Sequence, residues 1–288
     1  MTVLARIRSY ASFVRFSHSV FALPFALTGA LLASRKHPAT LSQAWWIIVC
    51  MVTARSAAMG FNRLVDARFD RTNPRTANRE LPAGRMSATE AGVFVAAMSA
   101  AFVVSAAQLG ALCLILSPVA LACIFWYSLA KRYTWATQFF LGLAMAVAPV
   151  GGWLAAGGRG GWEPWLLGLA IALWVGGFDV LYACQDLEVD RLQRLKSIPV
   201  RFGVRRSLWI SRVMHVGTAA CLAALALVAG LGPIYLVGVA AVAALLAYEQ
   251  SLVTAADLSQ VKRAFDLNGY VGILYFIMTA VSVYLSRP

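Results

Sequence analysis

The chain has 288 residues, of which 60% are hydrophobic and only 13% charged, and its mean hydropathy is +0.72. A soluble domain of this length would have about a quarter of its residues charged, so the composition excludes an ordinary soluble fold. Apolar stretches of about twenty residues recur along the chain, each long enough to cross a hydrocarbon layer about 30 Å thick. The short alternating segments of a membrane β-barrel are absent. The sequence therefore predicts an all-α, polytopic membrane protein.

Nine transmembrane helices are expected, in one integral-membrane domain that covers residues 1–288. Little more than Gln108-Leu109-Gly110 separates the third from the fourth. Gly230 to Pro233 separate the seventh from the eighth, because Gly and Pro interrupt a helical pattern. The expected spans are residues 17–34, 42–65, 91–109, 111–129, 137–156, 165–186, 207–230, 232–249 and 268–286.

The uneven distribution of basic residues predicts the orientation of these spans. The N-terminal segment and the connections after the second, fourth, sixth and eighth spans hold most of the Lys and Arg, whereas the opposite side has few. Because cytoplasmic loops are enriched in basic residues, the N-terminus and these connections are expected in the cytoplasm, with the chain integral to the cell (inner) membrane. The basic first residues lack the cleavage site of a signal peptide. The net charge of +13 then reflects topology, and no basic soluble domain indicates nucleic-acid binding.

The second span ends in a row of polar side chains within "NRLVDARFD", residues 62–70. Residues three, four or seven apart share one face of a helix. Asn62, Asp66 and Asp70 are therefore expected on one face, at a cytoplasmic helix end.

The sixth span ends in a similar way within "DVLYACQDLEVD", residues 179–190. Here the shared face is expected to carry Asp179, Tyr182, Asp186 and Asp190. The repeated pattern, four spans apart, indicates two similar helical halves, roughly residues 1–135 and 136–288.

Carboxylates at the edge of a bilayer are costly unless they are paired, hydrated or bound to metal. Two helices that present them to one cavity could hold Mg²⁺, which takes a few carboxylates and fills its other positions with water and substrate phosphate. The Arg and Lys that follow each motif would meet the remaining phosphate charge. The plainer alternative, pairing with nearby Arg at a wet interface, explains one motif more readily than two of matching spacing.

Together these residues resemble the UbiA superfamily of intramembrane aromatic prenyltransferases. That family has a first motif NDxxDxxxD or NxxxDxxxD, and a second motif DxxxD preceded by an Asp and a YAxxD element. This chain has Asn62-x₃-Asp66-x₃-Asp70 and Asp179-x₂-Tyr182-Ala183-x₂-Asp186-x₃-Asp190. The resemblance covers most of the chain and continues in "RTANRELPAG" (75–84), "YSLAKRYTWATQFFLG" (127–142) and "LKSIPVRFG" (195–203).

The resemblance implies Mg²⁺-dependent transfer of a polyprenyl group from its diphosphate to an aromatic acid, at the cytoplasmic end of a lipid-open cavity. Metal ions and cations directed at the departing diphosphate would lower the barrier to breaking the allylic C–O bond. Asn62, Asp66 and Asp70 are assigned to one Mg²⁺–diphosphate group, and Asp186 and Asp190 to the other. Asp179 completes the catalytic carboxylates. The basic residues that would bind the diphosphate, or else face solvent or lipid headgroups, are Arg75, Arg79, Lys131, Arg132 and Lys196.

Arg55 precedes Asn62 by seven residues, about 10 Å deeper along the same helix face. A buried Arg there needs an anionic partner. It could bind the carboxylate of the aromatic acceptor, order Asp179, or form only a structural ion pair with Asp179. Tyr127 and Tyr182 could line the carbocation path, since aromatic faces stabilise cations, or they could be ordinary interfacial anchors.

Two residues depart from the family pattern. Arg63 stands where many members have the first Asp of NDxxDxxxD, so the metal site is expected to survive with one ligand fewer, and Arg63 could instead bind diphosphate. Arg194 replaces a glycine that is common before the LKS element, which would alter the loop over the site.

A secondary transporter is the alternative function, but transporters place their coupling sites near the bilayer midplane. A CDP-alcohol phosphotransferase, which is also multi-span and rich in carboxylates, is disfavoured because its DG-AR-G-D-D signature is missing. The acceptor is 4-hydroxybenzoate by default, whereas "HSVFALPFAL" (18–27), "NPRTANRELPAGR" (73–85) and "SIPVRFG" (197–203) resemble the menaquinone branch, which uses a dihydroxynaphthoate.

Overall fold

The computed structural model of the protein describes residue 13, residues 22–36 and residues 38–285. Residues 17–21 of the first expected span, and residues 18–21 of the "HSVFALPFAL" stretch, lie outside the described residues. So do most of the basic N-terminal segment and the end of the ninth expected span.

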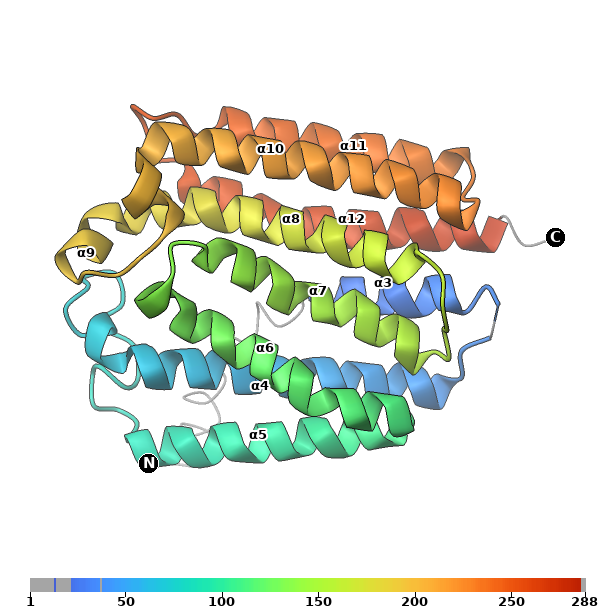
Figure 1. The fold of residues 1–288 in the computed structure, drawn as a ribbon, viewed down its shortest axis with the longest axis horizontal. Coiled ribbons are helices and arrows are strands. Elements are labelled where there is room, and N and C mark those ends of the chain that lie inside the picture. Colours follow the sequence, from blue (N-terminus) through green and yellow to red (C-terminus); the bar gives the residue numbers. More distant parts are fainter. Residues whose placement is uncertain (1–12, 14–21, 37, 286–288) are drawn as a thin grey trace.

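The described residues form α-helices and one short 3₁₀ helix, without a β-strand, so the all-α prediction is confirmed (Figure 1). The elements are α3 (Leu23–Ala33), α4 (Leu41–Asp70), α5 (Ala88–Gln108), α6 (Ala111–Tyr133), α7 (Thr137–Ala155), α8 (Glu163–Ala183), η1 (Cys184–Asp186), α9 (Leu187–Leu192), α10 (Ile198–Ala229), α11 (Pro233–Ser251) and α12 (Val261–Leu285). Eight segments of the described chain are long and apolar enough to cross a membrane, and α3 is a shorter apolar helix. The protein is therefore an integral, multi-pass membrane protein.

Several helices begin or end away from their expected bounds. The α4 helix begins at a capping box, in which Thr40 and Gln43 exchange hydrogen bonds, and it continues to Asp70 instead of residue 65. The α10 helix begins at Ile198 instead of residue 207, because Gly203, with φ of 76°, joins a first turn to the long span. The sixth expected span is interrupted, since α8 ends at Ala183 and η1 follows.

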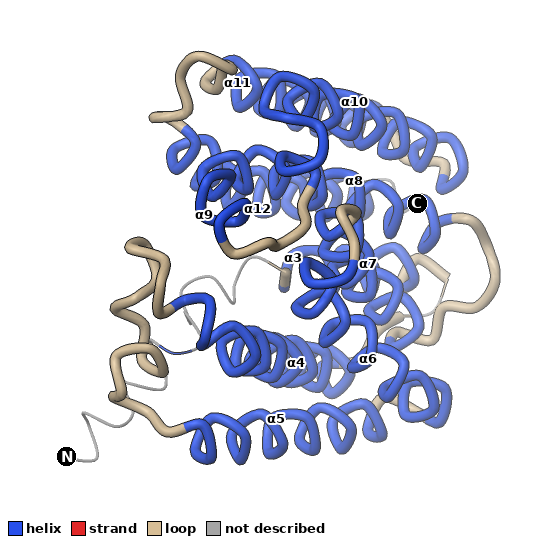
Figure 2. Tube along the Cα trace, turned by 60° about the vertical axis from the view of Figure 1, so that its left-hand side comes forward, coloured by secondary structure: helices blue, strands red, loops and turns tan. Residues whose placement is uncertain are grey.

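The long helices lie side by side, with α9 and the connection between α4 and α5 at one end of the molecule (Figure 1). The second view places α3 and α7 between a group formed by α4, α5 and α6 and a group formed by α8, α10, α11 and α12 (Figure 2). This arrangement brings the end of α4 opposite the end of α8, although more than a hundred residues separate them.

Small residues allow the middle helices to approach closely. A Cβ atom added at Gly29 of α3 would lie 2.0 Å from the carbonyl oxygen of Pro149 in α7, and one added at Gly152 would lie 2.0 Å from that of Ala26. Small residues let helix backbones meet in membranes, where van der Waals packing takes the place of a hydrophobic driving force. The α3–α7 contact therefore depends on glycine in both helices.

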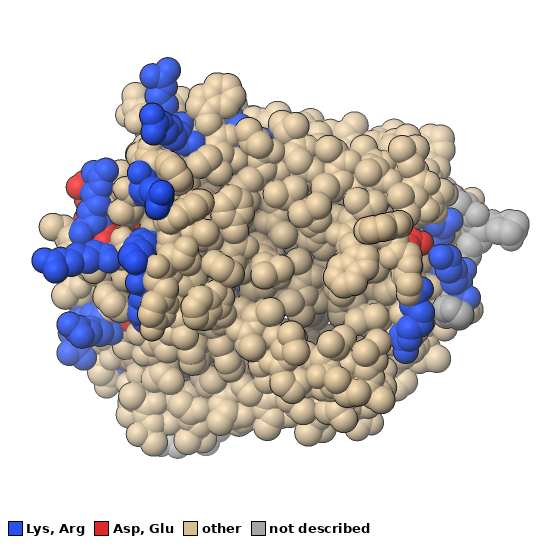
Figure 3. All heavy atoms as spheres, in the orientation of Figure 1, with Lys and Arg blue, Asp and Glu red and all other residues tan. Residues whose placement is uncertain are grey.

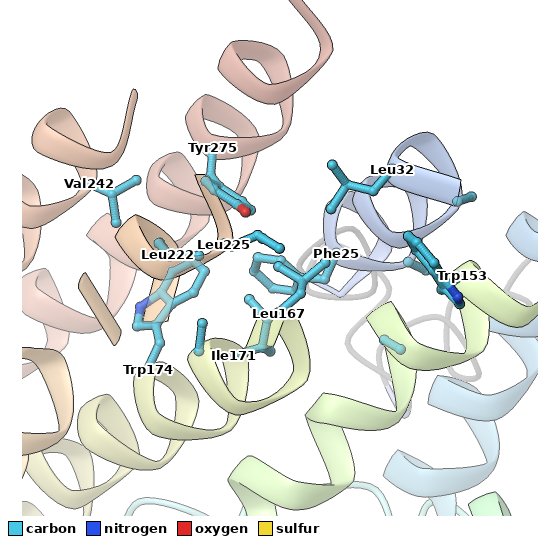
Figure 4. Packing of buried hydrophobic residues seen from close by; sticks show 14 of the residues in the cluster. Phe25, Leu32, Trp153, Leu167, Ile171, Trp174, Leu222, Leu225, Val242 and Tyr275 are labelled. Carbon is cyan, nitrogen blue, oxygen red and sulfur yellow. The ribbon is translucent and has the colours of Figure 1, made fainter. Parts of the chain in front are cut away.

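A continuous apolar core fills the space between α3, α7, α8, α10, α11 and α12 (Figure 4). Phe25 meets Trp174 edge to face, with ring centroids 5.0 Å apart. The indole Nε1 of Trp174 donates to Oδ1 of Asn268 on α12, so a buried polar atom is satisfied across two helices. This packing holds α8 in place, and α8 carries the second acidic motif.

Lys and Arg gather over the end of the molecule that contains α9, and a smaller group lies at the opposite end (Figure 3). Between the two ends, the face shown is covered by residues other than Lys, Arg, Asp and Glu. This pattern matches an apolar band flanked by two polar ends, of which one is the more basic.

Candidate active site

The last turns of α4 provide one wall of the candidate site. Asn62, Asp66 and Asp70 lie one helical turn apart, and the amide Nδ2 of Asn62 donates to Oδ2 of Asp66 at 3.2 Å. Asp66 and Asp70 are only 3% and 7% exposed. Buried carboxylates need compensating partners, and cationic side chains from other segments supply them here.

Two consecutive basic residues at the end of α6 contact Asp66. Lys131 Nζ lies 2.8 Å from Asp66 Oδ2, and Arg132 lies 3.0 Å from Asp66 Oδ1. Arg132 also donates to the carbonyl oxygen of Val65 at 2.6 Å. The end of α6 is thereby fixed against the acidic face of α4.

The segment between α4 and α5, residues 71–87, is called the α4–α5 loop below. Arg79 of this loop donates to Asp70 Oδ2 at 2.8 Å. Arg75 binds both carboxylate oxygens of Asp186, at 3.2 and 2.6 Å, and donates to the hydroxyl of Tyr182 at 2.8 Å. Partial burial lowers the pKa of Arg75, but the nearby Asp186 carboxylate outweighs it and the net pKa lies above the ordinary value. Arg75 therefore joins the two acidic motifs as a permanent cation.

The second wall is not one continuous helix, which corrects the expectation of a single helical face. Asp179 lies on α8, Asp186 on η1 and Asp190 on α9, because the helix ends at Ala183. The three carboxylates still lie within electrostatic range of one another, and Lys131 lies within range of Asp179 and Asp190. The break changes the direction of the chain and keeps these groups at one end of the bundle.

Lys196 contacts the end of α6. Its backbone N–H donates to the carbonyl of Lys131 at 2.7 Å, and its Nζ donates to that of Tyr133 at 3.0 Å. Lys196 therefore fixes the connection after α9 to α6, and its ammonium forms none of the ion pairs found within the described part of the chain.

Sequence reasoning missed Gln193, which joins the two acidic walls. Its Nε2 donates to the carbonyl of Phe69 at 2.9 Å and to Oγ1 of Thr72 at 2.8 Å. A single Gln in a charged stretch gives no periodic signal, so the sequence alone could not have identified it.

A cavity of about 540 Å³ lies between α4, α5, α6, α7 and α8, deeper in the bundle than the acidic residues; none of them lines it, and it reaches toward them as far as Ala58 on α4 and Tyr127 on α6. Its lining is almost entirely apolar, and Arg55 and Tyr127 are the charged and phenolic side chains in it. Tyr127 lies within electrostatic range of Arg55, Asp66 and Asp179, so these four groups share one region of the molecule. The Nε of Arg55 is buried without a hydrogen-bond partner.

Arg55 forms none of the ion pairs found among the described residues, so the expected structural pair with Asp179 is not present. A buried guanidinium group facing a cavity remains able to bind an anionic ligand there.

The cavity reaches the apolar lateral surface of the helix bundle. Its lining includes apolar side chains that are more than a third exposed, on α6, α7 and α8, and Figure 3 shows this face of the molecule, hollowed near its middle. These side chains are Leu116, Val119, Leu143, Trp165 and Leu169. A long apolar chain could therefore enter from the membrane without crossing polar groups.

Arg63 points away from the site, which corrects both roles considered for it. Its side chain is 5% exposed and forms an ion pair with Glu80 of the α4–α5 loop. Consecutive helical residues point about 100° apart, so a side chain next to Asn62 faces another direction. Arg63 therefore takes the place of neither a metal ligand nor a diphosphate ligand in this structure.

Arg194 has a φ of 55°, in the left-handed region that glycine adopts without cost. It follows α9 in a Schellman arrangement. The N–H of Arg194 donates to the carbonyl of Arg191 at 3.1 Å, and the N–H of Leu195 donates to the carbonyl of Asp190 at 2.8 Å. A glycine would adopt this backbone without cost, whereas Arg194 adopts it despite its side chain.

The site contains oxygen donors suited to a hard cation. Among the described residues, no three His, Cys, Asp or Glu side chains are gathered as a ready metal cage. Mg²⁺ does not require one, because it is bound by one or two carboxylates together with substrate phosphates and water. Asp66 and Asp70 on one side, and Asp186 and Asp190 on the other, fit that requirement.

The comparisons with known proteins agree with this geometry. The sequence model of the UbiA prenyltransferase family matches residues 22–278. The chain belongs to the UbiA prenyltransferase family. It is thus a prenyltransferase, as the resemblance of its two motifs implied.

Relatives of this UbiA protein include the 4-hydroxybenzoate octaprenyltransferase of Aliivibrio fischeri (strain MJ11), which is 32% identical over 243 residues, or 83% of this chain and 84% of that protein. The apo structure of a UbiA homologue from Aeropyrum pernix K1 has a TM-score of 0.85 and 37% identity, covering 92% of this chain and 98% of that one. A UbiA homologue from Archaeoglobus fulgidus bound to GPP and Mg²⁺ has the same fold, with a TM-score of 0.71 and 19% identity over 95% of this chain and 99% of that one.

Proposed function

We propose that this protein transfers a polyprenyl group from polyprenyl diphosphate to an aromatic carboxylic acid in quinone biosynthesis, with Mg²⁺ as cofactor. The observation that carries the proposal is that an apolar cavity and a cluster of ion pairs adjoin in this structure. A lipid-open apolar cavity, with Arg55 and Tyr127 in its wall, lies beside two sets of carboxylates that are surrounded by cations.

The relatives support the substrate class. The Aliivibrio fischeri protein is named for 4-hydroxybenzoate as acceptor and an octaprenyl group as donor. The default acceptor of this chain is therefore 4-hydroxybenzoate, with a dihydroxynaphthoate as the alternative. The Archaeoglobus fulgidus homologue, which shares the fold, holds a prenyl diphosphate together with Mg²⁺.

The residues that would hold Mg²⁺ are Asn62, Asp66 and Asp70 in one group and Asp186 and Asp190 in the other. When bound, the metal ions would neutralise negative charge that develops on the departing diphosphate. A Mg²⁺–diphosphate group needs carboxylates for its metal ion and basic side chains for its phosphates. Each ion pair in the site already contains one of each.

The basic residues would bind the phosphate oxygens. Lys131, Arg132, Arg79 and Arg75 now contact Asp66, Asp70 and Asp186. A diphosphate placed between the acidic walls would let these side chains exchange a carboxylate for a phosphate oxygen, and Arg can do so with two parallel hydrogen bonds. Lys196 would join them only by leaving the carbonyl of Tyr133.

The chain's own groups also account for the chemistry at the prenyl carbon. Breaking the allylic C–O bond places positive charge on that carbon, and the aromatic faces of Tyr127 and Tyr182 would stabilise it. The carbocation adds to the ring of the acceptor, and the ring then loses a proton. Asp179, which lies within electrostatic range of Tyr127, is assigned to accept that proton on a carboxylate oxygen.

Loop charge supports a cytoplasmic position for the active site and the N-terminus, in the inner membrane of a bacterial-type cell. The apolar cavity supports delivery of the donor from the membrane lipid, while the aromatic acid enters from the aqueous side. The transporter alternative is weakened because Asp66 and Asp70 lie in the last turns of α4, and Asp186 and Asp190 lie beyond the end of α8, whereas transporters place their coupling sites near the bilayer midplane.

The decisive experiment is an assay of purified protein in detergent with a labelled prenyl diphosphate and each acceptor in turn. We expect transfer that requires Mg²⁺ and is abolished by EDTA, with product formed from 4-hydroxybenzoate or a dihydroxynaphthoate. Uptake of solute by proteoliposomes without any transfer product would overturn the proposal in favour of transport.

A further inference from the structure

A buried ion pair lies behind the acidic face of α4. The side chains of Arg63 on α4 and Glu80 on the α4–α5 loop are 5% and 6% exposed and form a charge-assisted hydrogen bond. Removing either partner of such a pair would leave an uncompensated charge in a site that water does not reach.

Both the backbone of Glu80 and the partner of its side chain, Arg63, are held by further contacts. Its carbonyl accepts the N–H groups of Arg85 at 2.9 Å and Met86 at 3.2 Å. Arg63 lies over the ring of Phe13, with its guanidinium carbon 5.8 Å from the ring centroid. A small apolar cluster that is separate from the main core surrounds this region and includes Phe13, Leu81, Met86 and Ala91.

The neighbour of Glu80 points the other way, into the site. Arg79 donates to Asp70 at 2.8 Å, and Arg75, earlier in the same loop, contacts Asp186. The loop is thus held at two successive residues, with Glu80 attached to the back of α4 and Arg79 attached to its acidic face.

We propose that Arg63 and Glu80 are a positioning pair, which fixes the α4–α5 loop so that Arg79 and Arg75 reach the diphosphate of the donor. This deepens the proposed function and rests on it, since the loop's arginines are the groups that would bind the donor. Arg63 thereby acts through the loop and touches no substrate. The pair also gives Arg63 a role that a metal-ligating Asp at the same place could not fill.

The first test is the near-isosteric variant Glu80→Gln, which keeps the shape and removes the charge. We expect the donor KM to rise by about tenfold or more, because a charge pair that orders the loop is lost. The acceptor KM should stay within about twofold, since Arg55 lies outside the loop. A matched control is Glu188→Gln, which breaks an exposed ion pair with Arg191 at the same end of the molecule and should leave both KM values unchanged.

A second measurement does not depend on activity. The exposed Arg71 and Arg85 make the α4–α5 loop a substrate for trypsin. In the wild type, inorganic pyrophosphate with Mg²⁺ should slow cleavage of the loop. In Glu80→Gln, cleavage should be several-fold faster and this protection should be weaker. Because Arg63→Ala leaves a buried carboxylate unpaired and can fail to fold, the double variant Arg63→Met/Glu80→Met serves as the folded comparison without a charge pair.

Three outcomes separate the alternatives. A raised donor KM with faster loop cleavage, in both Glu80→Gln and the double variant, supports the positioning role. An unchanged donor KM in an active Glu80→Gln protein overturns it. A fall in kcat that is fully explained by a smaller fraction of folded protein, with the donor KM unchanged, overturns it as well. If the wild type transfers no prenyl group, the proposed function fails, whereas the cleavage measurement still reports whether Glu80 orders the loop.

Discussion

The side-chain amide of Gln193, which follows α9, donates to the backbone carbonyl of Phe69 at the end of α4, at 2.9 Å. These two residues are 124 positions apart in the sequence, and each lies beside one of the acidic motifs. The hydrogen bond therefore connects the two walls of the site directly, without passing through the ion pairs that a bound diphosphate would rearrange.

Replacing Gln193 by Ala removes this hydrogen bond and the one to Thr72. The hydrogen bond to Phe69 is partly buried and the one to Thr72 is exposed, so together they are worth about 1–2 kcal/mol. We expect a lower midpoint of thermal unfolding and a donor KM raised several-fold, because the walls are no longer held at a fixed separation. Gln193→Glu should be worse than Gln193→Ala, since a carboxylate would face the carbonyl oxygen of Phe69. Equal kinetics for wild type, Gln193→Ala and Gln193→Glu would show that the connection has no effect on the site.

Arg194 offers a prediction of increased stability. Its left-handed backbone costs a non-glycine residue about 1 kcal/mol, and its side chain is exposed, so Arg194→Gly loses no buried contact. Part of the gain is offset because glycine is more flexible in the unfolded chain, which leaves an increase of about 0.5 kcal/mol. Thermal unfolding in detergent should show a midpoint raised by about 1–2 °C. Arg191→Gly, inside the last turn of α9, should lower the midpoint.

The carboxylates should be indispensable for transfer but not for folding. Asp66→Asn and Asp186→Asn retain the size of each side chain and its ability to accept one hydrogen bond. They remove a charge that both Mg²⁺ and the basic residues require, so transfer is expected to fall by at least about a hundredfold, with normal amounts of protein in membranes. Glu188→Asn, at an exposed position near the same end, is the control. Full activity of either Asp variant, or of the wild type in EDTA, would contradict the Mg²⁺ assignment.

The two motifs could be located from the sequence because each combines a helical period with an apolar span, and both signals are local. The order and approximate bounds of the helices followed for the same reason. The turn at Cys184–Asp186 could not be predicted, since it has neither Gly nor Pro to mark it. Contacts such as Arg75 with Asp186 depend on how α4 and α8 pack, and a single sequence holds no direct record of that packing.

The direction of the Arg63 side chain follows from the sequence alone. A side chain next to Asn62 lies about 100° around the helix from the acidic face, so the same period that grouped Asn62 with Asp66 also separated Arg63 from them. Its partner Glu80 lies in a loop without periodicity. The direction of Arg63 was therefore predictable and its contact was not.

Arg55 presents a buried cation to the cavity without a partner for its Nε. A guanidinium group held in an apolar wall is costly unless an anion compensates it. The carboxylate of an aromatic acid can do so with two parallel hydrogen bonds. Arg55 lies about 10 Å below Asn62 along α4. An acceptor whose carboxylate is bound to Arg55 would therefore point its aromatic ring toward Asn62, where the prenyl carbon of the donor would lie.

The last prediction is that Arg55 determines use of the acceptor and not of the donor. Loss of a desolvated, charge-assisted contact costs about 2–4 kcal/mol, so Arg55→Ala should reduce kcat/KM for the aromatic acid about 30- to 1000-fold. The donor KM should change little, because the groups assigned to the diphosphate lie at the other end of that helix face. Arg55→Lys should recover only part of the loss, since a single ammonium lacks the planar fork of guanidinium. Met51→Leu, in the same cavity wall, controls for disturbed packing. The measurement that decides is a comparison of the acid with its decarboxylated analogue, for which the wild type and Arg55→Ala should have nearly the same kcat/KM. If Arg55 binds the carboxylate, the loss of kcat/KM occurs only for the acceptor that carries one. An equal loss for both acceptors would therefore show that Arg55 only maintains the structure of the cavity wall.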